Sequence, residues 1–242
     1  MRAFILVGGL GTRLRSLKLD IPKPMIDIGG KPFLTYLLDD LKNAGIHDFV
    51  LCLGFGAERV ESYFGTGEKL GIRIEYSREH TPLGTAGAIK HAEQFAAEKN
   101  FILNGDSYLA LDYGNMLNFH RKKNAQVTIA CTRIKDTQDY GNISLDSNQR
   151  ITAFAEKNPS SRANLINGGV YLFNKSAFEL IPAHKKVSLE NEIFPLIAGN
   201  EHCYGFVTNG YFIDIGTPER LRRAQTEFLL KKGHENDKRQ IV

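Results

Sequence analysis

A glycine-rich segment near the start of the chain carries the residue types that bind phosphate. Glycines let backbone amides approach an anion closely, while arginine and lysine supply fixed positive charge. The residues concerned are Gly8, Gly9, Gly11, Thr12, Arg13 and Lys23, the last of them between Pro22 and Pro24. Because an apolar run at residues 3–7 precedes them, the pattern predicts a polyphosphate site at the carboxyl end of a first strand.

Spacing excludes two common phosphate-binding loops. A P-loop needs Gly-x-x-x-x-Gly-Lys-Ser/Thr, and the chain contains no such stretch. A dinucleotide fingerprint that begins at Gly9 needs a third glycine at position 14, where the chain has Leu14. The spacing leaves two possibilities, another kind of phosphate-binding loop or an ordinary glycine-rich turn between a strand and a helix.

The segment from Gly8 to Leu14, taken with Pro22-Lys-Pro-Met25, resembles the opening of the sugar-1-phosphate nucleotidyltransferases. These enzymes join a nucleoside triphosphate to a sugar phosphate and release pyrophosphate. The resemblance covers roughly residues 1–230, and five motifs occur in the order of the family. It implies that Arg13 contacts the β,γ-phosphates and that Lys23 contacts the reacting phosphates, so these two are the predicted catalytic residues.

In-line attack on a nucleoside triphosphate brings several negative charges together, so a divalent cation is expected. Mg²⁺ prefers carboxylate oxygens, phosphate oxygens and water. Asp106 follows the apolar run 101–103 and a glycine, although a turn or helix-cap aspartate would look the same. Asp214 lies between two isoleucines, where a carboxylate is costly to bury without a partner. Both match the metal-binding aspartates of the family and are the predicted Mg²⁺ ligands.

Other matching segments supply candidate substrate contacts. Gly84 and Gly87 open a helix whose early amides are predicted to read a base or ribose edge, although a plain helix start would look alike. Glu156 can accept hydrogen bonds from sugar hydroxyls and Lys157 can meet the sugar phosphate. The predicted nucleotide-binding residues are Leu6, Gly8, Gly9, Gly11, Thr12, Arg13, Gly84, Thr85 and Gly87. The predicted sugar-phosphate-binding residues are Gly105, Tyr140, Gly141, Glu156, Lys157, Asn167 and Gly168.

The stretch between Arg13 and Lys23 is the clue to the substrates. Its Arg-Ser…Asp-x-Pro-Lys-Pro-Met form is similar to that of bacterial heptose 1-phosphate guanylyltransferases, which make GDP-heptose for surface polysaccharide. Mannose-1-phosphate guanylyltransferases come next. The favoured substrates are therefore GTP and heptose 1-phosphate, with uridylyl, thymidylyl or cytidylyl transfer as alternatives. A nucleotide-sugar binding module that has lost turnover also stays open.

Composition favours an ordinary globular protein. Of the 242 residues, 42% are hydrophobic and 24% charged, and the net charge of +4 is spread among 27 acidic residues. This argues against a nucleic-acid partner. The three cysteines and seven histidines show no zinc-site spacing, and no apolar run is long enough to span a membrane. The expected location is the cytoplasm, and homo-oligomerisation is left open.

Strand and helix patterns alternate in the first half, which predicts an α/β fold. Strands are expected at 3–7, 49–53, 72–76 and 101–103, with helices at 33–41, 57–64 and 86–97 between them. Such alternation predicts a Rossmann-like, mainly parallel central sheet with helices on both faces, the nucleotide-diphospho-sugar transferase fold. Ligands bind outside the carboxyl ends of its strands, so the glycine segment and Asn104–Asp106 should meet at one edge.

The second half is β-rich. Strands at 127–132, 141–145, 151–156 and 169–173 are expected to lie antiparallel over the sheet. A helix is expected at 189–197, and strands 204–208 and 211–215 should form a hairpin through Asn209-Gly210. One domain at 1–230 is predicted, with a nucleotide-binding half to about 125 and a sugar-binding half after it. Residues 231–242 are expected to form a charged, frayed tail.

Overall fold

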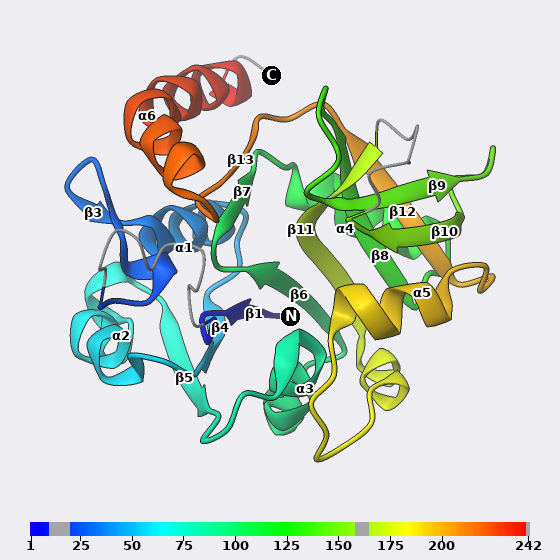
Figure 1. The fold of residues 1–242 in the computed structure, drawn as a ribbon, viewed down its shortest axis with the longest axis horizontal. Coiled ribbons are helices and arrows are strands. Elements are labelled where there is room, and N and C mark those ends of the chain that lie inside the picture. Colours follow the sequence, from blue (N-terminus) through cyan, green and yellow to red (C-terminus); the bar gives the residue numbers. More distant parts are fainter. Residues whose placement is uncertain (10–19, 158–164, 241–242) are drawn as a thin grey trace.

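The computed structural model describes residues 1–9, 20–157 and 165–240. Within these residues, nine strands form one sheet (Figure 1). Its first four strands in the chain are β1 (Arg2–Leu6), β4 (Asp48–Leu53), β5 (Arg73–Arg78) and β6 (Lys99–Asn104). They pair in parallel in the order β6-β1-β4-β5. This arrangement confirms the predicted parallel sheet, because strands joined by helices run the same way.

The β-rich second half extends this sheet instead of lying over it. Its strands are β8 (Val127–Arg133), β9 (Gly141–Leu145), β10 (Ile151–Glu156), β11 (Leu165–Asn174) and β12 (Cys203–Thr208). The long strand β11 pairs antiparallel with β6, β8 and β9 and so joins the two halves. Strand β12 runs parallel to β8. The antiparallel pairing predicted for the strands at 127–132, 141–145, 151–156 and 169–173 is therefore confirmed, whereas their predicted position over the sheet is wrong.

The predicted hairpin at Asn209-Gly210 does not form. Strand β12 pairs with β8, whereas β13 (Phe212–Asp214) pairs antiparallel with β7 (Ser107–Leu109) in a separate two-stranded sheet. Between them, a Cβ atom on Gly210 would lie 1.8 Å from the Ala110 carbonyl oxygen. Glycine is thus required for the close approach of the chain to β7, not for a hairpin turn.

Helices cover both faces of the large sheet, as predicted. They are α1 (Phe33–Asn43), α2 (Ala57–Phe64), α3 (Gly84–His91), α4 (Tyr113–Lys122), α5 (Phe194–Ile197) and α6 (Pro218–Gln240). Alternate residues of the central strands enter two apolar clusters, so Ile5 belongs to one and Phe4 to the other. The helix predicted at 189–197 is a π-helix (Leu189–Ile193) followed by α5. No helix in the described part of the chain has the length and apolar character that crossing a membrane requires.

Short elements complete the fold. A two-stranded pair joins β2 (Asp27–Ile28) to β3 (Lys31–Pro32), and short 3-10 helices cover Lys23–Met25, Glu68–Leu70, Glu93–Phe95 and Lys175–Leu180. The predicted helix at 86–97 is therefore α3 followed by a 3-10 turn. The first of these turns places Lys23 beside the end of β6.

The C-terminal helix α6 differs from the predicted tail. It continues to Gln240, past position 231 where fraying was expected, and it packs over α1 (Figure 1). Lys232 is only 9% exposed, and its ammonium group donates hydrogen bonds to the carboxylate of Asp40 and the hydroxyl of Tyr108. Asp40 itself is 4% exposed. The buried pair of Lys232 and Asp40 fixes α6 against α1 and β7. The high charge of residues 231–242 had instead suggested a solvent-exposed tail.

Replacing Lys232 with alanine should lower the free energy of unfolding by about 3 kcal/mol, because it leaves the Asp40 carboxylate buried without its cation. Chemical denaturation monitored by circular dichroism measures the loss. Lys231→Ala is the matched control, since Lys231 is the exposed neighbour on the same helix. Equal stability of the two variants would contradict a stabilising role for the Lys232–Asp40 pair.

Candidate active site

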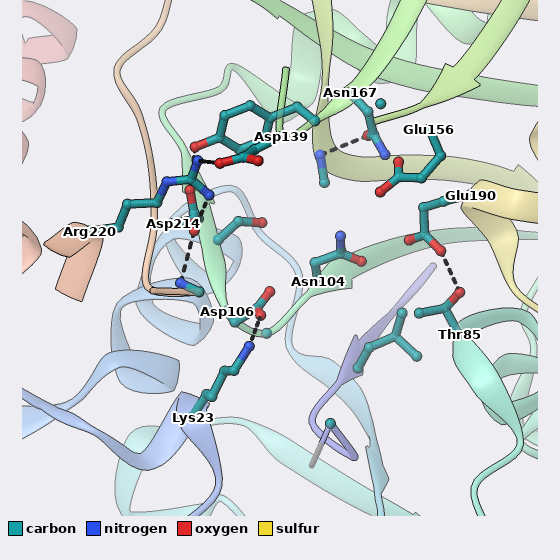
Figure 2. Close-up of a pocket in the computed structure, with 18 of the residues that line it drawn as sticks. Lys23, Thr85, Asn104, Asp106, Asp139, Glu156, Asn167, Glu190, Asp214 and Arg220 are labelled. Carbon is teal, nitrogen blue, oxygen red and sulfur yellow. Dashed lines mark hydrogen bonds and ion pairs between the residues drawn. The ribbon is translucent and has the colours of Figure 1, made fainter. Parts of the chain in front are cut away.

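A cavity of about 360 Å³ opens at the junction of the two halves of the sheet (Figure 2). It lies at the carboxyl ends of β1 and β6, where the fold predicted a ligand. Of the predicted site residues, those that line it are Leu6, Gly9, Lys23, Thr85, Gly105, Asp106, Tyr140, Gly141, Glu156, Lys157, Asn167 and Asp214. Gly11, Thr12 and Arg13 lie outside the described residues.

The glycine segment and the end of β6 meet, as the sheet rule predicted. Leu6 of β1 is in register with Asn104 of β6, and the Gly105 amide donates to the Leu6 carbonyl at 3.0 Å. A Cβ atom on Gly105 would lie 2.5 Å from that carbonyl oxygen. Glycine at 105 therefore allows the chain to cross the end of β1 and deliver Asp106 to the cavity.

Lys23 and Asp106 form an ion pair inside the cavity. The ammonium nitrogen of Lys23 lies 3.2 Å from Asp106 Oδ2. The Lys23 side chain is 11% exposed and that of Asp106 is 37% exposed. Lys23 lies between Pro22 and Pro24 and begins the short 3-10 helix Lys23–Met25, which fixes its backbone. This pair places a fixed positive charge next to an acidic group that still reaches solvent.

Asp214 lies beside Asp106 because β13 pairs with β7. It is in register with Ser107, and the Ile215 amide donates to the Asp106 carbonyl at 3.0 Å. The buried carboxylate accepts hydrogen bonds from the Tyr140 hydroxyl and from the Gly216 amide. Burial, followed by the negative charge of Asp214, raises the pKa of Tyr140, so its hydroxyl stays a donor. The hydrogen bonds from Tyr140 and Gly216 thus offset the cost of burying the Asp214 carboxylate between two isoleucines.

Arg220 adds a cation to the same group. Its guanidinium lies 2.6 Å from Asp139 and 3.5 Å from Asp214, and it stacks over the Tyr140 ring at 4.7 Å. Arg220 is on the first turn of α6, where its backbone amide donates a hydrogen bond to the hydroxyl oxygen of Thr217, the residue that caps the helix. Sequence reasoning missed Arg220, since an arginine after a Thr-Pro-Glu helix start looks like a surface residue.

The donor set of the cavity suits a hard divalent cation. Within the described residues, five carboxylates and three cationic side chains line it: Asp106, Asp139, Glu156, Glu190, Asp214, Lys23, Lys157 and Arg220. Asn104 Oδ1 and Ser107 Oγ next to Asp106 are buried oxygens with no hydrogen-bond partner in this part of the chain. No group of three or more acidic, histidine or cysteine side chains clusters as a metal cage in the described residues. An ion held by Asp106 and Asp214 would therefore need substrate phosphates as further ligands, which is typical of Mg²⁺.

The sugar side of the cavity is built around β11. The Asn167 side-chain amide donates to the Tyr171 hydroxyl at 2.9 Å, and its carbonyl oxygen accepts from the Gly169 amide. Gly169, not the predicted Gly168, lines the cavity. Gly168 instead packs against Leu109, where a Cβ atom would lie 2.6 Å from Cδ2. The register of β11 decides which of two adjacent glycines faces the site.

The predicted base-reading segment is held differently from the expectation. The amides of Ala86 and Gly87 donate to the Val187 carbonyl at 3.0 and 3.2 Å. A Cβ atom on Gly84 would lie 2.4 Å from the same oxygen. Neither Gly84 nor Gly87 lines the cavity. The two glycines allow close packing against residues 185–187, so these amides are not open to a base.

Glu79 lies near the glycine segment and was not predicted. Its Oε2 accepts from the Leu83 amide at 2.9 Å. A Cβ atom on Gly8 would lie 3.0 Å from Glu79 Oε1, and one on Gly54 would lie 2.8 Å from it. Burial is the main cause that raises the pKa of Glu79. Gly8 itself does not line the cavity but packs against Gly54 at the edge of this carboxylate.

Comparisons with known proteins agree with the fold. The model of the nucleotidyl transferase family matches residues 2–231. The chain is 42% identical over 228 residues to a D-glycero-alpha-D-manno-heptose 1-phosphate guanylyltransferase of Aneurinibacillus thermoaerophilus, and the match covers 94% of this chain and 98% of the relative. It is 38% identical over 230 residues to a mannose-1-phosphate guanylyltransferase of Mycobacterium tuberculosis, covering 94% of this chain but only 64% of that longer relative.

A solved structure has the same architecture. HddC from Yersinia pseudotuberculosis, complexed with GMP-PN, superimposes with a TM-score of 0.80 at 35% identity. The match covers 94% of this chain and 99% of that one. The similarity therefore extends over both halves of the sheet and over the cavity between them.

Proposed function

The chain belongs to the nucleotidyl transferase family, and from this premise we propose that it transfers a nucleoside monophosphate to a sugar 1-phosphate with release of pyrophosphate. The observation that carries the proposal is the meeting of Lys23, Asp106 and Asp214 at the carboxyl ends of β1, β6 and β13. A lysine and two carboxylates around one cavity suit the transfer of a highly charged phosphoryl group.

In the proposed reaction, an oxygen of the sugar phosphate attacks the α-phosphorus of the nucleoside triphosphate. The bond from that phosphorus to the bridging oxygen of the β-phosphate breaks, and pyrophosphate leaves. The attacking oxygen is already ionised at neutral pH, so no general base is needed. Lys23 would stabilise charge on the reacting phosphates, and Lys157 would hold the sugar phosphate.

Mg²⁺ is part of the proposal. Asp106 and Asp214 would hold the ion, whose charge offsets that of the triphosphate. Arg220 and Tyr140 then act as positioning residues, since both contact the Asp214 carboxylate. The excess of carboxylates over cations among the described lining residues supports this, because a triphosphate would otherwise be repelled.

We favour GTP as the nucleotide and heptose 1-phosphate as the acceptor. The similarity to a heptose 1-phosphate guanylyltransferase over 98% of its length supports this pair. Glu79 adds a chemical reason, because its carboxylate beside Gly8 is an acceptor only. Guanine presents two adjacent donors, N1–H and the exocyclic amino group, to such a carboxylate. Uracil and thymine present one donor between two carbonyl oxygens, which a carboxylate would repel.

Replacing Glu79 with glutamine should lower kcat/KM for GTP about tenfold or more, since the base loses a hydrogen bond to a charged acceptor. The ratio of GTP to UTP turnover should fall with it. Glu75→Gln is the matched control, because Glu75 is an exposed carboxylate on β5, the strand that ends immediately before Glu79. An unchanged GTP to UTP ratio in the Glu79 variant would exclude Glu79 as the base-reading group.

The direct test is a grid of nucleoside triphosphates against sugar 1-phosphates, read as pyrophosphate release with Mg²⁺. We expect most turnover with GTP and D-glycero-alpha-D-manno-heptose 1-phosphate. Mannose 1-phosphate is the second candidate acceptor, on the similarity to the mannose-1-phosphate guanylyltransferase. Turnover with UTP or dTTP but not GTP would overturn the guanylyl assignment. No turnover with any pair would favour a binding module.

A further inference from the structure

Glu190 lies where the base-side segment meets the sugar side of the cavity. It belongs to the π-helix Leu189–Ile193 and lines the cavity with Thr85 and Asn191. Figure 2 shows its side chain extending into the cavity beside Glu156, above Thr85. No sequence motif pointed to it, because an acidic residue in a Ser-Leu-Glu-Asn-Glu run resembles a solvated helix start.

The carboxylate of Glu190 is held in one orientation. Its Oε2 accepts from the Thr85 hydroxyl at 2.7 Å and from the Ser188 hydroxyl at 2.9 Å. The Thr85 oxygen in turn accepts from the Leu189 amide at 2.8 Å. Both hydroxyl bonds of Glu190 fall on the same oxygen, so Oε1 is the oxygen with capacity for a ligand. A side chain oriented in this way is preorganised as an acceptor.

The surroundings of Glu190 are rich in acceptors. Glu156 and Glu190 both line this part of the cavity, and their negative charge, after the larger effect of burial, raises the pKa of the buried Tyr171. Asn167 also lines the cavity, and its side-chain amide donates a hydrogen bond to the Tyr171 hydroxyl. A ligand that fills this corner must therefore present hydrogen-bond donors. Glu156 lies 3.8 Å from the Lys157 ammonium, whereas Glu190 has no ion-pair partner among the described residues, so the ligand group that meets Glu190 must carry no negative charge.

We propose that Glu190 binds a ring hydroxyl of the sugar 1-phosphate and thereby selects a neutral, hydroxyl-rich sugar over an acidic one. The inference rests on the proposed function and deepens it. The Lys157 ammonium lies 3.8 Å from Glu156, so a phosphate bound by Lys157 would lie beside that carboxylate. Glu190 is then the carboxylate that would receive a ring hydroxyl.

Glu190→Gln tests this role while keeping the shape of the side chain. Its single carbonyl oxygen cannot serve both the two hydroxyls that now bond Oε2 and a sugar hydroxyl. We expect the KM for the sugar 1-phosphate to rise about ten- to a hundredfold, as for loss of a charged hydrogen bond, and the KM for GTP to stay within about twofold. A uronic acid 1-phosphate should be a poor substrate of the unmodified enzyme and a better one of the variant.

A panel of monodeoxy analogues of the accepted sugar separates a ligand contact from a structural role. With the unmodified enzyme, one analogue should lose about as much kcat/KM as Glu190→Gln does, and the variant should lose no more with that analogue. Glu192→Gln is the matched control, since Glu192 is an exposed carboxylate on the same helix that does not line the cavity.

The outcomes are distinguishable. An unmodified enzyme that releases no pyrophosphate with any substrate pair would overturn the proposed function, and this inference would fall with it. Turnover by the unmodified enzyme with an unchanged sugar KM in Glu190→Gln would overturn only the role of Glu190. Additive losses for every deoxy analogue would likewise exclude direct contact between Glu190 and a hydroxyl.

Discussion

Lys23→Ala should lower kcat by about a hundredfold or more while the fold persists. The Lys23 ammonium group is nearly buried against Asp106. It places a fixed positive charge at the carboxyl ends of the paired strands β1 and β6. A charge that is already in place stabilises developing negative charge on the phosphates without reorganisation. The fold should survive because the Asp106 side chain is 37% exposed and can be hydrated once its partner is removed.

Pyrophosphate release under saturating substrates measures the effect of Lys23→Ala, with circular dichroism as the check on folding. Lys31→Ala is the matched control. Lys31 forms a similar ion pair, 2.7 Å from Asp39, but it does not line the cavity. We expect this control to keep turnover within about twofold, since the Lys31–Asp39 pair lies outside the cavity and is half-buried, where an ion pair contributes little. Wild-type turnover in Lys23→Ala would contradict a catalytic role for this lysine.

Asp106→Asn should also lower kcat by about a hundredfold or more, and it should raise the Mg²⁺ concentration needed for half-maximal activity. Asparagine keeps the size of the side chain but removes the negative charge that a hard cation needs. Asp214 alone would then hold the ion, while Tyr140 and Arg220 compete for its oxygens. The Lys23 ammonium would lose its ion-pair partner as well, so its position in the cavity would be less fixed.

A magnesium titration of pyrophosphate release separates the two effects of Asp106→Asn. A shifted magnesium dependence indicates a lost metal ligand, whereas a lower kcat at the same magnesium dependence indicates a displaced Lys23. Asp39→Asn is the matched control, because Asp39 pairs with Lys31 outside the cavity. Normal kcat and normal magnesium dependence in Asp106→Asn would exclude Asp106 from both roles.

The fold was predictable as far as local pattern decides it. Apolar runs and helical spacing predicted the parallel strands and α1, and α2 begins and ends where the sequence placed it, at Ala57 and Phe64. Partner choice was not predictable, because strand patterns say nothing about which edge a strand joins. Residues 204–208 looked like half of a hairpin, yet β12 pairs in parallel with β8. The charge at Lys231 to Val242 suggested a frayed tail, whereas Lys232 is buried against Asp40.

The sequence by itself determined the chemical class of the site. Asp106 and Asp214 were candidates from their types and from the runs that precede them, since strand ends in an α/β sheet must meet at one edge, and the family resemblance assigned them, Gly105 and Lys23 to the site. Only the tertiary structure decided how each side chain is held. Pairing of β13 with β7 brings Asp214 beside Asp106, and the π-helix brings Glu190 to the sugar side. The physical reason is that a side chain acquires its partners only through contacts between segments distant in the chain, and local sequence patterns carry no information about those contacts.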